Sequence, residues 1–462
     1  MIDGLKPYPE YKASGSRWLG NVPEHWGIRN LRTLITKRAE RDRPDLPLLS
    51  VAREKGVFIR SLTNEKENHN VIPEDLSNYK VARAGDLVIN KMKAWQGSMG
   101  IAPCEGIVSP AYYVFSFRIN NHAYGQALLR SKPYVAHFGQ SSDGVRIGQW
   151  DLSIPGMRQI PVLVPSENEQ AAIVRFLNHA NGRIEKTIRA KKKLIALLNE
   201  QKQAIVHHVV TRGLDPSVPL KPSGIPWLGD IPQHWRIVRN MALFAHRVEA
   251  GIVDMPVLQV SLHSGVTAEE LDQFGRPKRL IADATKYKLV RTNDLAYNTM
   301  RMWQGAVGVV PFDGLVSPAY VVLKLREEAF SDFYNYIFRT HVYKQQVNRY
   351  SSGIVSDRNR LYWDSFKQIP NILLPRLEQE EIVAFIETET KSISVAIART
   401  EREINLLREY RTRLVADVVT GKLDVREDAA SLPDEAPPES EIATLEDSED
   451  LDAEDTSEED AA

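Results

Sequence analysis

Two long stretches of the chain carry apolar residues at alternating spacings of four and three, the pattern of a coiled-coil seam. One stretch covers residues 184–209 and the other covers 393–418. All eight seam positions of the first match those of the second at an offset of 209 residues, and six of eight are apolar in each. The apolar positions are Ile184, Ile188, Ile195, Leu198, Ile205 and Val209, then Ile393, Ile397, Ile404, Leu407, Leu414 and Val418. We predict two long helices that pair with each other.

The polar seam positions give a possible register for this pair. Lys191 and Lys202 interrupt the first seam, and Thr400 and Arg411 interrupt the second. Twofold symmetry across the pair requires the helices to run antiparallel. A seam centred on both helices would then place Lys191 opposite Arg411. The alternative is that each helix is amphipathic and packs only on its own domain.

The segments between the long helices are short and mixed, with Gly and Pro between them. Residues 87–89, 112–115, 321–323 and 371–374 are predicted to be strands. Ser166 and Glu169 form a capping-box pattern where the first long helix should begin. These features indicate a compact α/β module that precedes each long helix.

The chain repeats itself, so the module and its helix occur twice. Ser14–Trp26 recurs as Ser223–Trp235, and further motifs recur at nearly the same offset. These motifs are Trp95-Gln96-Gly97 with Trp303-Gln304-Gly305, Ser109-Pro110-Ala111-Tyr112 with Ser317-Pro318-Ala319-Tyr320, and Glu169-Gln170 with Glu378-Gln379. The eight tryptophans form four pairs if Trp150 is matched to Trp363 with a gap of four residues. Chance does not produce such a series, so the chain arose by duplication.

The predicted fold class is α/β (α+β), with two pseudo-twofold-related modules separated by a long antiparallel two-helix coiled coil. The predicted parts are a first module at 1–165, a long helix at 166–213, a linker and second module at 214–374, a second long helix at 375–424, and a disordered acidic tail at 427–462.

Composition places the chain among soluble proteins and shows a hidden charge asymmetry. It has 462 residues, a mean hydropathy of −0.33 and one cysteine, Cys104, which excludes an internal disulfide. No apolar run reaches the roughly 18 residues of a membrane helix, and Met1–Glu10 lacks a signal-peptide core, so we expect a cytoplasmic protein. Residues 427–462 hold 16 acidic and no basic side chains. Residues 1–426 therefore carry 59 basic and 44 acidic side chains, a net charge of +15.

Motifs for catalysis are missing from the sequence. Thr420-Gly421-Lys422-Leu423 lacks the upstream glycine and the hydroxyl residue of a phosphate-binding loop. No GxGxxG, GxSxG, HExxH or Asn-Pro-Pro-aromatic motif occurs. His207 and His208 are adjacent, so on a helix they face different ways and make a poor metal pair. We expect no catalytic site and no metal site in this chain.

Two basic modules on a stiff helical rod suit a reader of bipartite DNA, because phosphate neutralisation requires Lys and Arg. Two modules on a rod of ~45 Å would meet DNA about one helical turn apart. A two-module protein-interaction scaffold without DNA specificity fits the same architecture. A self-contained methyltransferase is a third alternative.

The repeated motifs, taken together, resemble the specificity subunit of type I restriction-modification systems, a host-defence system that also methylates DNA. The resemblance covers residues 1–424. It implies two target-recognition domains, a DNA-binding role on double-stranded DNA, and assembly with two adenine-methylating modification subunits and optionally two ATP-driven restriction subunits. It also implies that S-adenosylmethionine, ATP and Mg²⁺ bind those partners and that this chain holds no cofactor. The acidic tail is outside the resemblance.

The duplication helps to sort residues by role. Residues present in both copies serve what both share, such as scaffold, phosphate contacts or partner docking, whereas base-reading residues can differ. The shared Trp18, Trp26, Trp227 and Trp235 are therefore predicted to be core residues. The Trp-Gln-Gly turns are read either as structural or as DNA-contacting. The DNA-binding candidates are Arg53, Lys55, Arg60, Lys91, Lys93, Gln96 and Arg146 in the first copy, and Arg276, Lys278, Arg279, Arg301, Gln304, Arg358 and Arg360 in the second.

Overall fold

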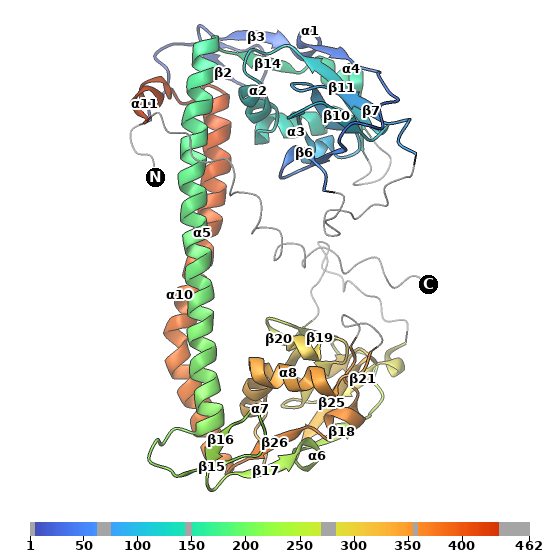
Figure 1. Cartoon of the computed structure of the whole chain (residues 1–462), viewed down its shortest axis with the longest axis vertical. Coiled ribbons are helices and arrows are strands. Elements are labelled where there is room, and N and C mark those ends of the chain that lie inside the picture. Colours follow the sequence, from blue (N-terminus) through green and yellow to red (C-terminus); the bar gives the residue numbers. More distant parts are fainter. Residues whose placement is uncertain (1–4, 62–74, 144–149, 269–282, 354–358, 434–462) are drawn as a thin grey trace. The chain divides into compact units, whose positions relative to one another are not determined.

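The computed structural model describes residues 5–61, 75–143, 150–268, 283–353 and 359–433. The chain divides into two compact units. The first unit contains the residues up to Lys191 together with those from Arg402, and the second contains Lys192–Glu401. Each unit holds one module and one half of each long helix, α5 (Glu167–Arg212) and α10 (Arg376–Val419) (Figure 1).

The first module is built around an antiparallel four-stranded sheet of order β4-β11-β8-β9, with short two-stranded sheets beside it. Its strands are β1 (Tyr11–Ala13), β2 (Asn21–Pro23), β3 (Gly27–Asn30), β4 (Ile35–Lys37), β5 (Leu49–Ala52), β6 (Gly56–Ile59), β7 (Lys80–Ala82), β8 (Leu87–Asn90), β9 (Met99–Ile101), β10 (Gly106–Val108), β11 (Tyr112–Phe117), β12 (Ser142–Asp143), β13 (Asp151–Leu152) and β14 (Pro161–Val164). Its helices are α1 (Leu31–Leu34), the 3₁₀ helix η2 (Ala94–Gln96), α2 (His122–Leu129), α3 (Lys132–Gln140) and α4 (Ile154–Arg158).

The second module repeats this topology, with a four-stranded sheet of order β18-β25-β22-β23. Its strands are β15 (Leu220–Pro222), β16 (Asp230–Pro232), β17 (Arg236–Arg239), β18 (Phe244–Arg247), β19 (Leu258–Ser261), β20 (Gly265–Ala268), β21 (Lys288–Val290), β22 (Leu295–Asn298), β23 (Val307–Val309), β24 (Gly314–Val316), β25 (Tyr320–Leu325) and β26 (Pro370–Leu373). Its helices are α6 (Asn240–Leu243), the 3₁₀ helices η3 (Ala284–Lys286) and η4 (Met302–Gln304), α7 (Ser331–Arg339), α8 (His341–Tyr350) and α9 (Trp363–Phe366). The predicted α/β class and the duplication are confirmed.

The Ser-Pro-Ala-Tyr motif leads into a central strand in both modules, and a lysine binds the backbone where that strand begins. Lys80 Nζ donates to the carbonyls of Pro110 (2.6 Å) and Tyr112 (2.5 Å) at the start of β11. Lys288 Nζ donates to the carbonyl of Tyr320 (2.6 Å) at the start of β25. Burial lowers the pKa of both ammonium groups. The two lysines are therefore part of the shared scaffold.

The repeated His-Trp and Glu-Gln motifs meet where each long helix begins. Glu169 accepts hydrogen bonds from Trp26 Nε1 (3.0 Å) and the Tyr8 hydroxyl (2.8 Å), and its other oxygen lies 2.9 Å from His25 Nε2. The equivalent Glu378 accepts from Trp235 Nε1 (2.9 Å) and lies 2.8 Å from His234 Nε2. These contacts fasten the long helix to the first strands of its own module. The prediction of core tryptophans is confirmed, since Trp26 and Trp235 are fully buried, Trp227 is buried and Trp18 is half-buried.

Only half of the predicted capping box forms at the start of α5. The Ser166 hydroxyl accepts a hydrogen bond from the Glu169 backbone N–H at 3.4 Å, as a cap does. The Glu169 side chain does not return to Ser166, because it binds Tyr8, His25 and Trp26 instead. Tertiary contacts thus outweigh the local capping interaction.

The two long helices lie side by side and run antiparallel within the units (Figure 1). In the first unit, Glu185 and Lys191 of α5 contact Arg411 and Glu403 of α10, so the numbers rise on one helix as they fall on the other. In the second unit, Lys202 Nζ donates to the Ser394 hydroxyl at 2.9 Å. All the predicted seam positions are buried or half-buried. The predicted pairing of the helices is confirmed.

The register expected for the seam is wrong by about two helical turns. Lys191 contacts Glu403 rather than facing Arg411, and Arg411 contacts Glu185. A seam centred on the helices would place Val418 opposite Ile184, but Val418 lies in the core of the first module with Trp26. The end of α10 thus docks on the core of the first module, and the seam is displaced from the centred register.

Two further expectations need correction. The predicted disordered tail begins too early, because Arg426–Ser431 forms helix α11 and Ala429 is buried in the core of the first unit. The rest of the tail, residues 434–462, lies outside the described residues. Trp150 and Trp363 do not occupy equivalent places. The Leu152 N–H donates to the Lys91 carbonyl and the Leu361 N–H donates to the Thr299 carbonyl, which aligns Leu152 with Leu361 and excludes the gap of four residues. Within the described residues, no helix is long and apolar enough to cross a membrane.

Candidate nucleic-acid interface

Arg53, Lys55 and Arg60 lie on or beside the β5–β6 hairpin of the first module. The Arg53 side chain is 69% exposed, and its Nε lies 3.6 Å from Glu54 Oε1. Lys55 Nζ stands 5.4 Å from the centre of the Phe58 ring. Arg60 lies near Tyr112, where burial raises the pKa of the phenol and the Arg60 charge opposes that rise. The three cations thus gather on one structural element.

A half-buried arginine fixes the tip of this hairpin, and the second module has the same arrangement. Arg130 Nη2 donates to the carbonyls of Arg53 and Glu54, both at 2.7 Å. Arg339 Nη2 donates to the carbonyls of Leu262 (2.6 Å) and His263 (2.8 Å) in the hairpin β19–β20. Burial lowers the pKa of both guanidinium groups. The exposed side chains at the tip are therefore held on a rigid base.

The Trp-Gln-Gly motif forms a tight turn at the end of a central strand in each module. Trp95 Nε1 donates to the Met92 carbonyl at 3.1 Å, and Trp303 Nε1 donates to the Met300 carbonyl at 3.0 Å. Gly97 and Gly305 close the 3₁₀ helices η2 and η4 with φ of 90° and 101°, a conformation that favours glycine. In both copies the indole and the glycine of the motif fix the turn, which holds the residues that precede it in place.

The residues presented by these turns are exposed and similar in the two modules. Met92 is 48% exposed and Met300 is 42% exposed, although methionine side chains normally favour the core. Next to them, Lys93 and Arg301 are exposed cations. Gln304 is exposed, whereas Gln96 is half-buried. Because packing does not explain an exposed methionine that recurs beside a cation, these turns are the best candidates for a contact that both modules make.

Two other predicted DNA-binding residues have partners inside the protein. Lys91 Nζ lies 2.9 Å from Asp151 Oδ2, and this hydrogen bond raises the pKa of the ammonium group. Arg360 Nη1 lies 3.4 Å from the Tyr362 hydroxyl at the edge of a cavity. Five predicted residues lie outside the described part of the chain: Arg146, Arg276, Lys278, Arg279 and Arg358.

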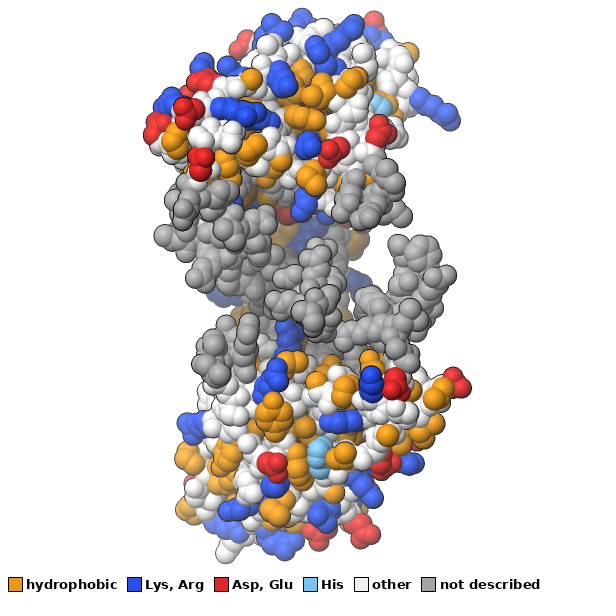
Figure 2. Space-filling view, turned by 90° about the vertical axis from the view of Figure 1, so that its right-hand side faces the viewer, with side chains coloured by type: hydrophobic (Ala, Val, Ile, Leu, Met, Phe, Trp, Pro, Cys, Tyr) orange, Lys and Arg blue, Asp and Glu red, His pale blue; other side chains and the backbone are white. Residues whose placement is uncertain are grey.

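The module surfaces combine cationic and hydrophobic side chains. Figure 2 shows Lys and Arg side chains interspersed with hydrophobic ones over the described residues. Across residues 5–61, 75–143, 150–268, 283–353 and 359–433, no group of three or more His, Cys, Asp or Glu side chains is placed to hold a metal ion. Such a mixed surface can bind an anionic polymer through its cations and contact base edges through its apolar groups.

Comparison with known proteins identifies the fold. No protein-family model matches the chain, and no curated protein matches it. It does resemble a chain from a structure concerned with complex assembly and conformational transition of the type I R-M system, with 13% identity and a TM-score of 0.60 over 87% of this chain and 99% of that one. This chain has the fold of that type I restriction-modification chain.

Two further solved structures match with lower TM-scores. They are the HsdS subunit from Thermoanaerobacter tengcongensis, at 15% identity and a TM-score of 0.43, and a type I restriction-modification S subunit from M. genitalium, at 11% identity and 0.31. They cover 87% and 85% of this chain, and 98% and 96% of their own chains, respectively.

Reasoning from the sequence missed two pairs of residues at the candidate interface. Met92 with Met300 and Arg130 with Arg339 recur at offsets of 208 and 209 residues, close to those of the repeated motifs. That recurrence was the available signal, but a single Met or Arg is too common a residue to stand out without its structural context. The fold shows that one pair is exposed and that the other fixes a hairpin.

Proposed function

We propose that this chain is the DNA-specificity subunit of a type I restriction-modification system. The main support is the shared fold with a type I R-M chain along nearly the whole length of both proteins. The internal duplication supports it further, since two modules with the same scaffold carry different exposed cations. Such a molecule reads two different half-sites, with shared residues contacting phosphates and differing residues contacting bases.

In this proposal the chain supplies sequence recognition and its partners supply the chemistry. Two modification subunits would bind S-adenosylmethionine and methylate adenines in double-stranded DNA, after turning each target base out of the stack. Two restriction subunits, where present, would use ATP and Mg²⁺. The chain itself would be non-catalytic and would work in the cytoplasm, where the DNA lies.

A gel shift at several salt concentrations tests the proposal. The purified chain, alone or with its modification subunits, should bind duplex DNA with an affinity that falls steeply as salt rises, because phosphate contacts release counterions. Methyl transfer should require the modification subunit. Partner binding without DNA binding would instead indicate a protein-interaction scaffold. Methyl transfer by the chain alone would indicate a self-contained methyltransferase.

A further inference from the structure

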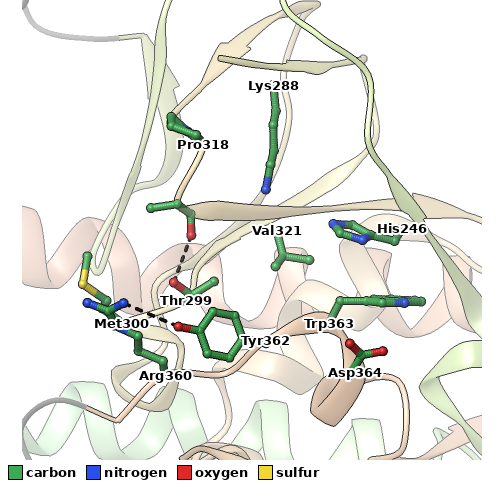
Figure 3. A pocket seen from close by; sticks show the side chains of 11 residues that line it. His246, Lys288, Thr299, Met300, Pro318, Val321, Arg360, Tyr362, Trp363 and Asp364 are labelled. Carbon is green, nitrogen blue, oxygen red and sulfur yellow. Dashed lines mark hydrogen bonds between the residues drawn. The ribbon is translucent and has the colours of Figure 1, made fainter. Parts of the chain in front are cut away.

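The second module contains a cavity of about 430 Å³, within the size range of small-molecule sites (Figure 3). It opens between β18, β21, the end of β22 and the segment that leads into α9. One wall is aromatic: the His246 ring stacks on Trp363, with centroids 5.3 Å apart and planes inclined by 22°. Tyr362, which is 50% exposed, stands beside the cavity, and Val321 forms part of its apolar lining.

The first module fills the same place with its own side chains. Equivalent backbone hydrogen bonds align Lys91 with Thr299, so Asp151 corresponds to Arg360. Strand pairing likewise aligns Tyr113 with Val321. In the first module, Lys91 bridges to Asp151 at 2.9 Å, and the Tyr113 hydroxyl donates to the Leu152 carbonyl at 3.4 Å.

The second module lacks both of these side-chain interactions. Thr299 and Arg360 replace the ion pair, and Val321 replaces the tyrosine ring. The aromatic walls are also specific to this module, because Tyr362 and Trp363 stand where the first module has Ser153 and Ile154. At these positions the lining of the cavity therefore differs from the equivalent side chains of the first module.

The lining has the chemistry that recognises a flat aromatic anion. Tyr362 offers an exposed aromatic ring, on which a base can stack, and the stacked rings of His246 and Trp363 form the wall beside it. Lys288 and Arg360 supply cations on the same cavity, and Lys288 retains donors beyond the one that it gives to Tyr320. The one acidic lining residue, Asp364, pairs with Lys367 at 2.6 Å, which balances its charge.

We propose that this cavity binds one unstacked nucleotide, with its base against the aromatic wall and its phosphate held by the cations. The nucleotide comes either from DNA held by the module or from a free mononucleotide. The DNA source rests on the proposed function, whereas the free source does not. An unstacked DNA base costs a few kcal/mol to expose, and stacking on aromatic side chains offsets that cost.

Calorimetric titration of the full chain with the four deoxynucleoside monophosphates and with a short single-stranded oligonucleotide tests the cavity. The wild-type chain should bind at least one of these probes. Val321→Tyr, which installs the residue of the first module, should weaken binding about tenfold or more, and Tyr362→Ser should weaken it about tenfold through lost stacking. The matched control Tyr113→Val changes the other module and should leave the affinity unchanged. Tyr362 is half exposed, so its variant tests the site even if Val321→Tyr fails to fold.

Duplex binding by the same variants identifies the source of the nucleotide. If Val321→Tyr also weakens the gel shift of duplex DNA, the base comes from DNA; if duplex binding is unchanged, the ligand is a free nucleotide. A chain that binds nucleotides but no duplex would overturn the proposed function and leave the cavity assignment standing. The assignment is overturned if the wild-type chain binds none of the probes, or if Val321→Tyr and Tyr362→Ser both bind them as tightly as wild type does.

Discussion

Lys191 Nζ lies 2.5 Å from Glu403 Oε2, across the interface of the two long helices. The pair shows how a cation in the middle of an apolar seam is accommodated. The lysine side chain is 27% exposed and the glutamate 36%, so the alkyl stem packs in the seam while the charges meet at its edge. Arg411 does the same with Glu185 at 2.9 Å. Lys191 and Arg411 thus each have an acidic partner on the opposite helix, and Lys202 donates to the Ser394 hydroxyl there, which favours this register over others.

A double-mutant cycle on this pair should detect coupling. Lys191→Ala and Glu403→Ala are expected to lower the free energy of unfolding, with a coupling energy of about 0.5 kcal/mol because both groups are partly exposed. Urea unfolding of the full chain at low salt measures it, and the coupling should shrink at high salt. The control is Lys193→Ala, at an exposed neighbour on α5. Its effect on the free energy of unfolding should add to that of Glu403→Ala. Additivity of the Lys191 pair would contradict the register.

The two glutamates that fasten the long helices should differ in their effect on stability. Glu169 is only 4% exposed and accepts hydrogen bonds from Tyr8 and Trp26, whereas Glu378 is 23% exposed and has no counterpart of Tyr8 among its hydrogen bonds in the described structure. Glu169→Ala should therefore cost about 2–3 kcal/mol, since it leaves buried donors without an acceptor. The matched Glu378→Ala should cost less. Chemical unfolding of both variants provides the comparison, and equal losses would show that the Tyr8 contact contributes nothing.

Periodicity and duplication made the larger features predictable. Seam positions such as Ile188 and Ile397 repeat over many turns, so both helices and their pairing follow from the sequence alone. The strand at Leu87–Asn90 is an apolar run that ends in a turn, so its pattern also predicts it directly. These features depend on local patterns, which the sequence shows directly.

Features that depend on long-range contacts were not predictable. The register was missed because Val418 docks on the core of the first module, and no local pattern shows that contact. In the sequence, Trp150 and Trp363 resemble a repeated pair. In the structure, the Trp150 ring centroid lies 5.2 Å from that of Trp95, whereas the Trp363 ring stacks on His246. The candidate interface was found only in part, because exposure decides whether a repeated residue such as Met92 belongs to the core or to a contact surface.

The stability of the protein should fall as the pH drops below about 6.5, the ordinary pKa of histidine. Burial lowers the pKa of His246 in the folded state; Lys288 lowers it further, and Asp364 opposes the shift. The unfolded state then binds more protons in this range, so protonation favours unfolding. Burial also lowers the pKa of His137 and His207. Urea unfolding between pH 8 and about pH 5.5 measures the loss.

His246→Phe is the informative variant for this pH dependence. Phenylalanine can keep the stacking on Trp363 and does not titrate. The variant should therefore lose less stability than wild type over the same range. The matched change Lys37→Phe alters the equivalent position of the first module, which holds no histidine, and should leave the pH slope as it is. An identical slope in wild type and His246→Phe would contradict the assignment.

The exposed cations of the two turns should act as phosphate contacts. Lys93→Ala and Arg301→Ala should each weaken duplex binding about equally for all DNA sequences and lower the slope of log affinity against log salt by roughly one.

Arg53→Ala tests whether a cation present in only one module reads a base, because the position of Arg53 on the first module's hairpin has no equivalent cation in the second. If the Arg53 guanidinium donates two hydrogen bonds to one base, Arg53→Ala should remove about 1–3 kcal/mol of discrimination between bases at one half-site. Discrimination at the other half-site should stay intact. Gel shifts across a salt series and a library of duplexes separate these outcomes. A turn variant that changes sequence preference would assign the turn to base reading, and a turn variant with an unchanged salt slope would remove it from the interface.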